Sequence, residues 1–383
     1  MADRQKLDWL QSLRGLAALS VVLVHCRHFF RGADPSLTID HWFLPLASGV
    51  DLFFVVSGFI MVYATHNRAA GLATAVQFWW RRLIRVWPTY IAITVVYFVY
   101  YAWLPGTTDN EQILRLVRSI LFIPQSVDGF FFQQVVPVGW SLTYEILFYF
   151  YFGLALLAPG RWRWMAVAVG AILLLVVVPL VLGTTSLWQP MAPFSAQSYP
   201  WAPLLRVAVN PILWEFAFGM IAGLIYVSPL RVDSAPLRLA LVGGTAAAVA
   251  ANIFLAFDYL TLQMGLGYAV LVSIVAICAK TSGRFRTPRL LVRLGDISYT
   301  LYLIHWLVID IVWTALGRWD QVDVLRAILA TLVTLACSIA AAAALSPLLE
   351  RRLSQWIGTI LAAIAHGIRA GRGESAARTT SSD

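Results

Sequence analysis

Long apolar stretches, separated by short polar segments, dominate the chain. A helix needs about 20 apolar residues to cross the hydrocarbon core of a bilayer, and ten stretches approach that length. The predicted spans are 12–30, 47–65, 86–104, 139–158, 164–182, 207–227, 238–256, 260–279, 294–316 and 324–346. We therefore predict an all-α fold: a polytopic transmembrane helix bundle over residues 1–348, and a polar tail over 349–383 that is disordered at its end.

Two further segments lie between the predicted spans. Residues 110–125 have a helical pattern, but they are few and carry two arginines, and a span here would place Arg161 and Arg163 outside the cell. We expect this segment to be a re-entrant or interfacial helix. The loop 183–206 is almost uncharged and rich in Pro, Ser and Trp, which makes it a candidate lid or acceptor cleft.

Composition and charge agree with a membrane protein. Hydrophobic residues make up 60% of the chain and charged residues 12%, against about 25% charged in water-soluble domains; the mean hydropathy is +0.75. Basic residues collect in cytoplasmic loops, and with both termini inside, 21 of the 28 Lys and Arg residues face the cytoplasm. This bias accounts for the formal charge of +9 without any nucleic-acid surface. We predict a bacterial-type inner (plasma) membrane protein with cytoplasmic termini.

The cysteines and the N-terminus add no further chemistry. Cys26, Cys278 and Cys337 lie in apolar segments without a C-x-x-C pair, so we expect neither a disulfide framework nor a metal site. The N-terminal residues are basic, but no cleavage motif follows a short apolar core. We expect the first helix to remain as a membrane anchor.

Arg14 and His25 stand out in the first span. Their separation is close to three helical turns, so both side chains share a face and lie about 16 Å apart along the axis. An ionisable group inside hydrocarbon costs roughly 2.5 to 3.5 kcal/mol on insertion scales and usually signals function. His25 is therefore a candidate for direct chemistry, and a structural hydrogen bond is the alternative.

Several carboxylates lie within or beside other spans. Glu145, just inside the outer end of the fourth span, could orient a histidine and raise its basicity, or it could be a structural acid satisfied by hydroxyls. Asp51 and Ser57, within GVDLFFVVSGF, are weaker candidates. Glu215 in the sixth span has no assignable partner.

A second intramembrane histidine lies in the ninth span. Ser298, Tyr302 and His305 stand at positions i, i+4 and i+7, so they share one helical face. His305 either takes part directly or forms a hydrogen bond to Tyr or Ser between helices.

Arg82 and Arg85 lie three residues apart at the cytoplasmic mouth of the third span, on one helical face. Converging with Arg14, they form a credible site for a phosphorylated ligand; the alternative is a basic cluster on lipid phosphates. A phosphate-bearing donor would dock on these arginines, and a histidine and a carboxylate further up would activate an acceptor from outside. A nucleoside-phosphate acyl thioester fits that geometry.

The chain resembles the integral-membrane acyltransferases called the acyltransferase-three family. Arg14, ten residues and then His25 match the family's hallmark, and Arg82 with Arg85 matches its R-x-x-R motif. GVDLFFVVSGFIM, GWSLTYEILFY and GDISYTLYLIH are similar to its other landmarks. Glu350 resembles an acidic residue of the family that is often followed by Lys-Pro. In this sequence two arginines follow it instead.

The resemblance covers about residues 9–352, and VPVGWSLTYEILFYFYF is most similar to the branch that O-acetylates exopolysaccharides such as succinoglycan. It implies transfer of an acyl group, usually acetyl, from cytoplasmic acyl-CoA to a hydroxyl of an exopolysaccharide or other cell-envelope glycan. No cofactor would be bound permanently, because acyl-CoA is a substrate. The implied partners are the donor, the glycan acceptor, the lipid bilayer and proteins of exopolysaccharide assembly.

On this interpretation the candidate residues take separate roles. Arg14, Arg82 and Arg85 would hold the CoA phosphates. His25 would act as general base on the acceptor hydroxyl, with Glu145 orienting it or assisting. A covalent acyl-histidine relay is the alternative to direct transfer. The remaining candidates would line the substrate cavity: Asp51, Ser57, Tyr302 and His305.

Two other functions remain open at this point. The enzyme could acylate a small glycoside, antibiotic or lipid rather than a polymer. Alternatively, the chain could be a proton-coupled transporter or flippase in which buried His and Glu residues relay protons. Transporters often have repeated halves with interrupted helices, and neither feature is visible in the sequence.

Overall fold

The structure, a computed structural model, describes residues 7–30, 38–126, 133–183, 186–190, 201–256, 261–282, 287–315 and 323–359. Within these ranges it is helical and contains no strand, as predicted. The α-helices are α1 Asp8–Cys26, α2 Thr38–Phe43, α3 Gly49–Thr65, α4 Leu72–Phe98, α5 Asn110–Ile120, α6 Trp140–Ala155, α7 Gly160–Ile172, α8 Val178–Leu182, α9 Ala202–Ala208, α10 Leu213–Val227, α11 Ala235–Ala256, α12 Leu262–Ser282, α13 Arg289–Asp296, α14 Ser298–Ala315 and α15 Val324–Ser346.

Among the described residues, nine helical segments are long and apolar enough to span a membrane. These are Asp8–Phe30, Leu44–Thr65, Leu72–Trp103, Gly160–Leu182, Ala202–Val227, Ala235–Leu255, Leu262–Thr281, Ser298–Ala315 and Val324–Thr359. The protein is therefore a multi-pass membrane bundle. The remaining predicted span, 139–158, corresponds to α6, which has 16 residues and is not among the nine. This helix is short, and it carries Ser141, Thr143 and Glu145 within the apolar stretch.

Two predicted spans have different limits in the structure. The helix predicted at 86–104 begins at Leu72, so the basic residues before it lie on the same continuous helix. The span predicted at 294–316 is divided at Ile297 into α13 and α14. Polar residues, Asp296 and Ser298, flank the break, but the apolar pattern resumes directly after it and therefore favours one continuous span.

The short helix predicted at 110–125 is α5. The Asp109 side chain accepts a hydrogen bond of 2.7 Å from the Gln112 N–H, which is the usual way to satisfy a free donor at a helix start. Its position in a membrane interface remains a prediction. Half of the loop 183–206 lies outside the described residues, and the predicted lid or acceptor cleft remains a prediction.

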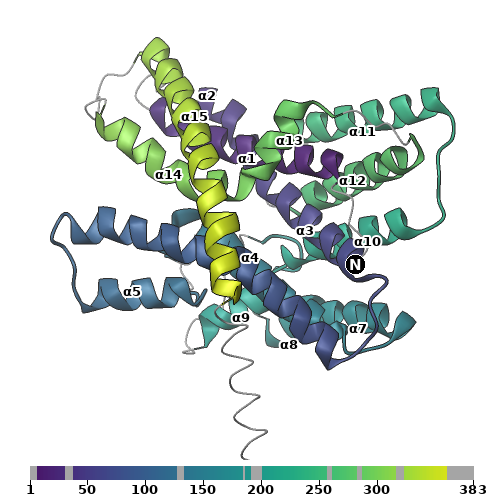
Figure 1. The fold of residues 1–383 in the computed structure, drawn as a ribbon. Helices are drawn as coiled ribbons and strands as arrows, with labels where there is room; N and C mark the ends of the chain where they lie inside the picture. Colours follow the sequence, from purple (N-terminus) through teal and green to yellow (C-terminus); the bar gives the residue numbers. More distant parts are fainter. Residues whose placement is uncertain are drawn as a thin grey trace, which may run out of the picture.

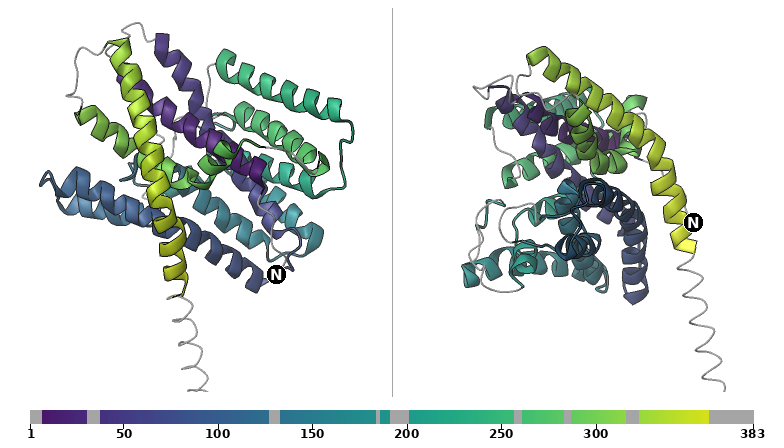
Figure 2. Two further views of the ribbon diagram at one scale, coloured as in Figure 1. Left: turned by 45° about the horizontal axis from the view of Figure 1, so that its top comes forward. Right: turned by 90° about the vertical axis from the view of Figure 1, so that its left-hand side faces the viewer.

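The helices form two groups in space (Figures 1 and 2). One group contains α1 with α11–α14, and the other contains α4, α5 and α7. The long C-terminal helix runs past both groups, as the right-hand view of Figure 2 shows. Cavities that bind substrates in helical membrane proteins are built between such groups.

Glycines allow α3 and α10 to pack very closely. A Cβ at Gly58 would overlap the carbonyl oxygen of Phe216, and a Cβ at Gly219 would overlap that of Val55. Lipid supplies no hydrophobic drive between helices, so small residues that permit close contact stabilise such crossings. This crossing fixes α3, which lines the candidate site.

The C-terminal helix continues beyond the predicted domain boundary at 348. A π-helical segment, Pro347–Leu353, follows α15, and the helical segment ends at Thr359. Glu350 accepts hydrogen bonds from the hydroxyl and the N–H of Thr300 in the first turn of α14, where a carboxylate stabilises the helix dipole. Residues 360–383, where we predict disorder, lie outside the described residues.

Candidate active site

The two intramembrane histidines meet in the structure. His25 on α1 and His305 on α14 approach with the His305 Nε2 3.0 Å from the His25 Nδ1. The same His25 Nδ1 lies 2.8 Å from the carbonyl oxygen of Val21. His305 is fully buried, and the indole ring of Trp306 packs edge-on to His25 with centroids 4.8 Å apart.

His25 lines a cavity of about 420 Å³, the histidine cavity. Arg115 on α5 donates to the carbonyl oxygens of Gln133 and Gln134 at 2.8 and 3.2 Å, and all three residues line the cavity wall. The cavity therefore combines amide and guanidinium groups with aromatic rings. Its aromatic and imidazole lining comprises His25, His28, Trp140, Tyr302 and Trp306.

The three predicted arginines line a second cavity, the arginine cavity, together with Glu145. Arg14 comes from α1, and Arg82 and Arg85 come from α4. The Arg82 guanidinium lies over the ring of Tyr149 at 5.2 Å from the centroid, a favourable cation–π geometry. Among the described residues, no carboxylate lies within ion-pair distance of these three arginines, although Glu145 interacts with Arg14 and Arg82 at longer range, so three guanidiniums face a single carboxylate in the cavity.

Glu145 belongs to the arginine cavity. It accepts a hydrogen bond of 3.0 Å from the Ser57 hydroxyl and another from the Tyr149 hydroxyl. Ser141, Glu145 and Tyr149 are spaced four residues apart on α6, so one helical face presents all three to the cavity. Ser141 and Tyr149 were missed in the sequence, although this spacing around Glu145 was a usable signal.

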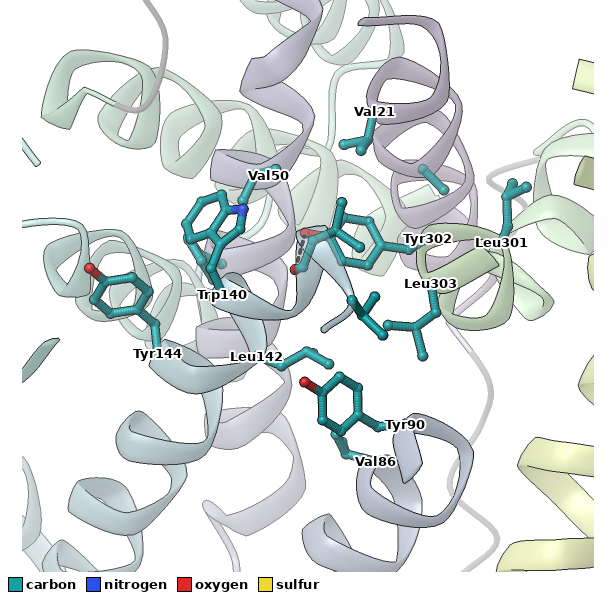
Figure 3. Packing of buried hydrophobic residues seen from close by; sticks show 14 of the residues in the cluster. Val21, Val50, Val86, Tyr90, Trp140, Leu142, Tyr144, Leu301, Tyr302 and Leu303 are labelled. Carbon is teal, nitrogen blue, oxygen red and sulfur yellow. Dashed lines mark hydrogen bonds between the residues drawn. The ribbon is translucent and has the colours of Figure 1, made fainter. Parts of the chain in front are cut away.

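Tyr302 stands between the two cavities and lines both of them, as does Val50 on α3. Figure 3 shows the Tyr302 ring extending between α14 and the side chains of Val50 and Trp140. Its hydroxyl lies 2.8 Å from the Ser141 hydroxyl and donates to the Val138 carbonyl oxygen at 3.1 Å. Tyr302 and Val50 therefore form the wall that the two cavities share.

These positions divide the predicted site residues into two sets. Arg14, Arg82, Arg85, Ser57 and Glu145 line the arginine cavity. His25 lines the histidine cavity, with His305 behind it.

The expected contact between Glu145 and His25 is not formed, because a backbone carbonyl and His305 occupy the positions beside the His25 Nδ1. Glu145 is instead engaged with Ser57 and Tyr149. An orienting role of Glu145 on His25 would therefore have to be indirect in this conformation.

Asp51 lines neither cavity. Its carboxyl is fully buried against that of Glu215, which is also fully buried. The Ser48 hydroxyl lies nearby, 2.9 Å from the hydroxyl of Tyr268. Two carboxyl groups in contact away from water cannot both be ionised, so this pair joins α3 to α10 and gives Glu215 the partner that the sequence did not reveal.

The described residues contain no cluster of three or more His, Cys, Asp and Glu side chains that could hold a metal ion. An imidazole faces one cavity, and guanidiniums in the adjoining cavity can bind an anion. The arrangement suits transfer of a group from an anionic carrier to a neutral acceptor.

Comparison with known proteins agrees with this geometry. A family model described as an acyltransferase domain matches residues 7–343. The exopolysaccharide production protein ExoZ of Rhizobium meliloti is 30% identical over 71% of this chain and 79% of its own length. The acyltransferase MdmB of Streptomyces mycarofaciens is 27% identical, with 79% of both chains covered. Nodulation protein 10 of Rhizobium leguminosarum is 27% identical over 80% of this chain and 84% of its own. No solved structure matches the chain.

Proposed function

The chain belongs to the family of acyltransferase domains whose model matches residues 7–343, and we propose that it transfers an acyl group, acetyl in the first instance, from acyl-CoA to a hydroxyl of an exopolysaccharide or other cell-envelope glycan. The protein would lie in a bacterial inner membrane, and the side of the bundle that binds the donor would face the cytoplasm. Membership of an acyltransferase family sets aside the transporter or flippase alternative.

The single observation that carries this proposal is the pair of cavities adjoining at Tyr302. The donor and the acceptor occupy separate chambers, and their reacting atoms meet at the shared wall. An arrangement of this kind would allow a cytoplasmic donor to react with an acceptor that never crosses the membrane.

Acyl-CoA as the donor is supported by the charge of the arginine cavity. Arg14, Arg82 and Arg85 converge with no ion-paired carboxylate in the part of the chain that the structure describes, and guanidiniums match phosphate oxygens in charge and geometry. With the phosphates held there, the thioester arm extends toward Tyr302.

His25 acts as the general base in this proposal. If its Nδ1–H donates to the Val21 carbonyl oxygen and to the His305 Nε2, its own Nε2 is unprotonated and available to accept a proton. Fixing the tautomer through the other ring nitrogen is the usual way in which proteins prepare a catalytic histidine.

The reaction then balances without another reagent. The acceptor hydroxyl gives its proton to the His25 Nε2 as its oxygen attacks the thioester carbonyl carbon. The carbon–sulfur bond breaks, and the CoA thiolate takes up a proton to become the free thiol. In the covalent alternative the His25 Nε2 attacks the thioester carbonyl carbon first, the carbon–sulfur bond breaks and CoA leaves as the thiolate. The acceptor oxygen then takes the acyl group from the acyl-histidine, which frees the imidazole, and the hydroxyl proton balances the CoA thiolate.

A glycan acceptor is suggested by the aromatic and amide lining of the histidine cavity and by the similarity to a protein named for exopolysaccharide production. Amphipathic aromatic rings offer an apolar surface with polar groups at its edge, which suits a saccharide. Proteins that assemble an exopolysaccharide would supply such an acceptor.

The decisive experiment uses purified protein in lipid nanodiscs with labelled acetyl-CoA and a panel of cell-envelope glycans. We expect an O-acetyl ester on a glycan, identified by mass spectrometry. Acetylation of only small glycosides or lipids would replace the polymer by the smaller acceptor class. Absence of transfer from every acyl-CoA would refute the donor assignment, and label retained on the protein before acceptor is added would favour the acyl-histidine route.

A further inference from the structure

A third cavity, the peripheral cavity, opens beside the arginine cavity on the side away from Tyr302. The two cavities share Ile60, Arg82 and Arg85 in their linings. The peripheral cavity has a volume of about 240 Å³ and adds Arg68 and Arg81 to the lining. A molecule held in the arginine cavity can therefore extend into the peripheral one past two shared guanidiniums.

The peripheral cavity is strongly positive. Of the ten described residues that line it, four are arginines and none is acidic. Arg81 and Arg85 stand at i and i+4 on α4, where like charges destabilise a helix. A polyanionic ligand bound in the peripheral cavity beside Arg81 and Arg85 would offset this repulsion.

Arg68 is presented from a fixed turn after α3. The buried guanidinium of Arg163 donates to the Thr65 carbonyl oxygen at 3.2 Å and to the Arg68 carbonyl oxygen at 3.1 Å. A cation on the last carbonyls of a helix stabilises its C-terminus. The opposite wall is α4, which carries Arg81, so the two guanidiniums enter the cavity from two separately held elements.

We propose that Arg68 and Arg81 bind the 3′-phosphate of CoA, so that the protein distinguishes CoA from dephospho-CoA; this inference rests on acyl-CoA being the donor. The order of groups in the donor supports the assignment. From the thioester outward, CoA has the pantetheine arm, the diphosphate and then the ribose 3′-phosphate. The shared Arg82 and Arg85 meet the diphosphate, and the arginines farthest from Tyr302 meet the farthest phosphate.

The test is binding of CoA and of dephospho-CoA, measured by isothermal titration calorimetry on the full chain in nanodiscs. A charged hydrogen bond contributes about 1.5 to 3 kcal/mol, so the wild-type protein should bind CoA at least about 10-fold more tightly than dephospho-CoA. Arg68→Gln and Arg81→Gln should each weaken CoA binding by about that factor and leave dephospho-CoA binding nearly unchanged. Arg161→Gln is the matched control, because this exposed arginine lies outside the cavity, and it should change neither affinity.

Equal affinity of the wild-type protein for the two ligands would overturn the inference while leaving the donor assignment intact. So would equal weakening of both ligands in the Arg68 and Arg81 variants. If the variants instead alter only the response to phosphatidylglycerol content of the nanodiscs, the arginines bind lipid headgroups and the inference fails. Binding of neither ligand would refute acyl-CoA as donor, which is a separate failure of the proposed function.

Discussion

At the residue scale, the chemistry of the site depends on which ring nitrogen of His25 is engaged in hydrogen bonds. The Nδ1 faces Val21 and His305, which leaves the Nε2 as the reactive atom on the cavity side. His305 therefore acts through His25 as a positioning residue, and it would also stabilise the charge that His25 gains when it accepts a proton.

His25→Ala should lower kcat by about 10²- to 10⁴-fold, the usual contribution of a general base. Binding of CoA should persist, because His25 is absent from the lining of the arginine cavity. Turnover of acetyl-CoA with acceptor and calorimetric binding of CoA measure the two effects. His66→Ala, at an exposed histidine after α3, is the control. Full activity of His25→Ala would refute the assignment.

Arg82→Lys should raise KM for acetyl-CoA about 10-fold and leave kcat within about twofold. Lysine keeps the charge but loses the planar fork that binds phosphate in two places and stacks on aromatic rings. Arg82 is buried over Tyr149, whereas Arg161 stacks on Trp162 at the surface. Arg161→Lys should therefore leave KM unchanged. An unaltered KM in Arg82→Lys would remove this residue from the donor site.

At the element scale, two contacts hold the helices that carry the site. The α3–α10 crossing fixes the wall with Val50 and Ser57, and it depends on glycines that leave no space for a side chain. The contact from Glu350 to Thr300 attaches the C-terminal helix to the start of α14, the helix that carries Tyr302.

Gly219→Ala should destabilise the protein by about 1 to 3 kcal/mol, the usual cost of overpacking, because the new Cβ would overlap the Val55 carbonyl. Thermal unfolding in detergent measures the effect. The matched control is Gly243→Ala in α11, where a Cβ has nothing within 4 Å, and alanine should be neutral or slightly stabilising there. Equal melting temperatures for the two variants would contradict the close crossing.

At the scale of the whole molecule, three cavities in series run from the peripheral arginines through the arginine cavity to the histidine cavity. The walls come from helices at both ends of the chain, since α1, α3, α4, α6 and α14 all contribute. No part of the chain shorter than most of its length could assemble this path.

Truncation tests how much of the C-terminus belongs to the bundle. A chain that stops after Thr359 should retain activity, because it keeps Glu350 on Thr300 and Gly358 beside Ile84. A chain that stops after residue 348 should lose most activity and melt at a lower temperature, since it lacks both contacts. Acyl transfer and thermal unfolding of the two proteins provide the comparison. Equal behaviour would support the predicted boundary at 348 instead.

The sequence by itself determined that the chain is a multi-pass helical bundle and placed nine of its spans, because burial in lipid demands long apolar helices that local periodicity reveals. It also identified Arg14, Arg82 and Arg85 as candidates for one site, because a charged residue within or beside an apolar segment stands out in the sequence.

Tertiary structure decided which residues these side chains face. The pairing of His25 with His305, the place of Glu145 beside the arginines, the burial of Asp51 on Glu215 and the wall at Tyr302 all join helices far apart in sequence. Helical spacing specifies the face of one helix but not the neighbour that the face meets, and that neighbour depends on close packing such as the glycine crossing of α3 and α10.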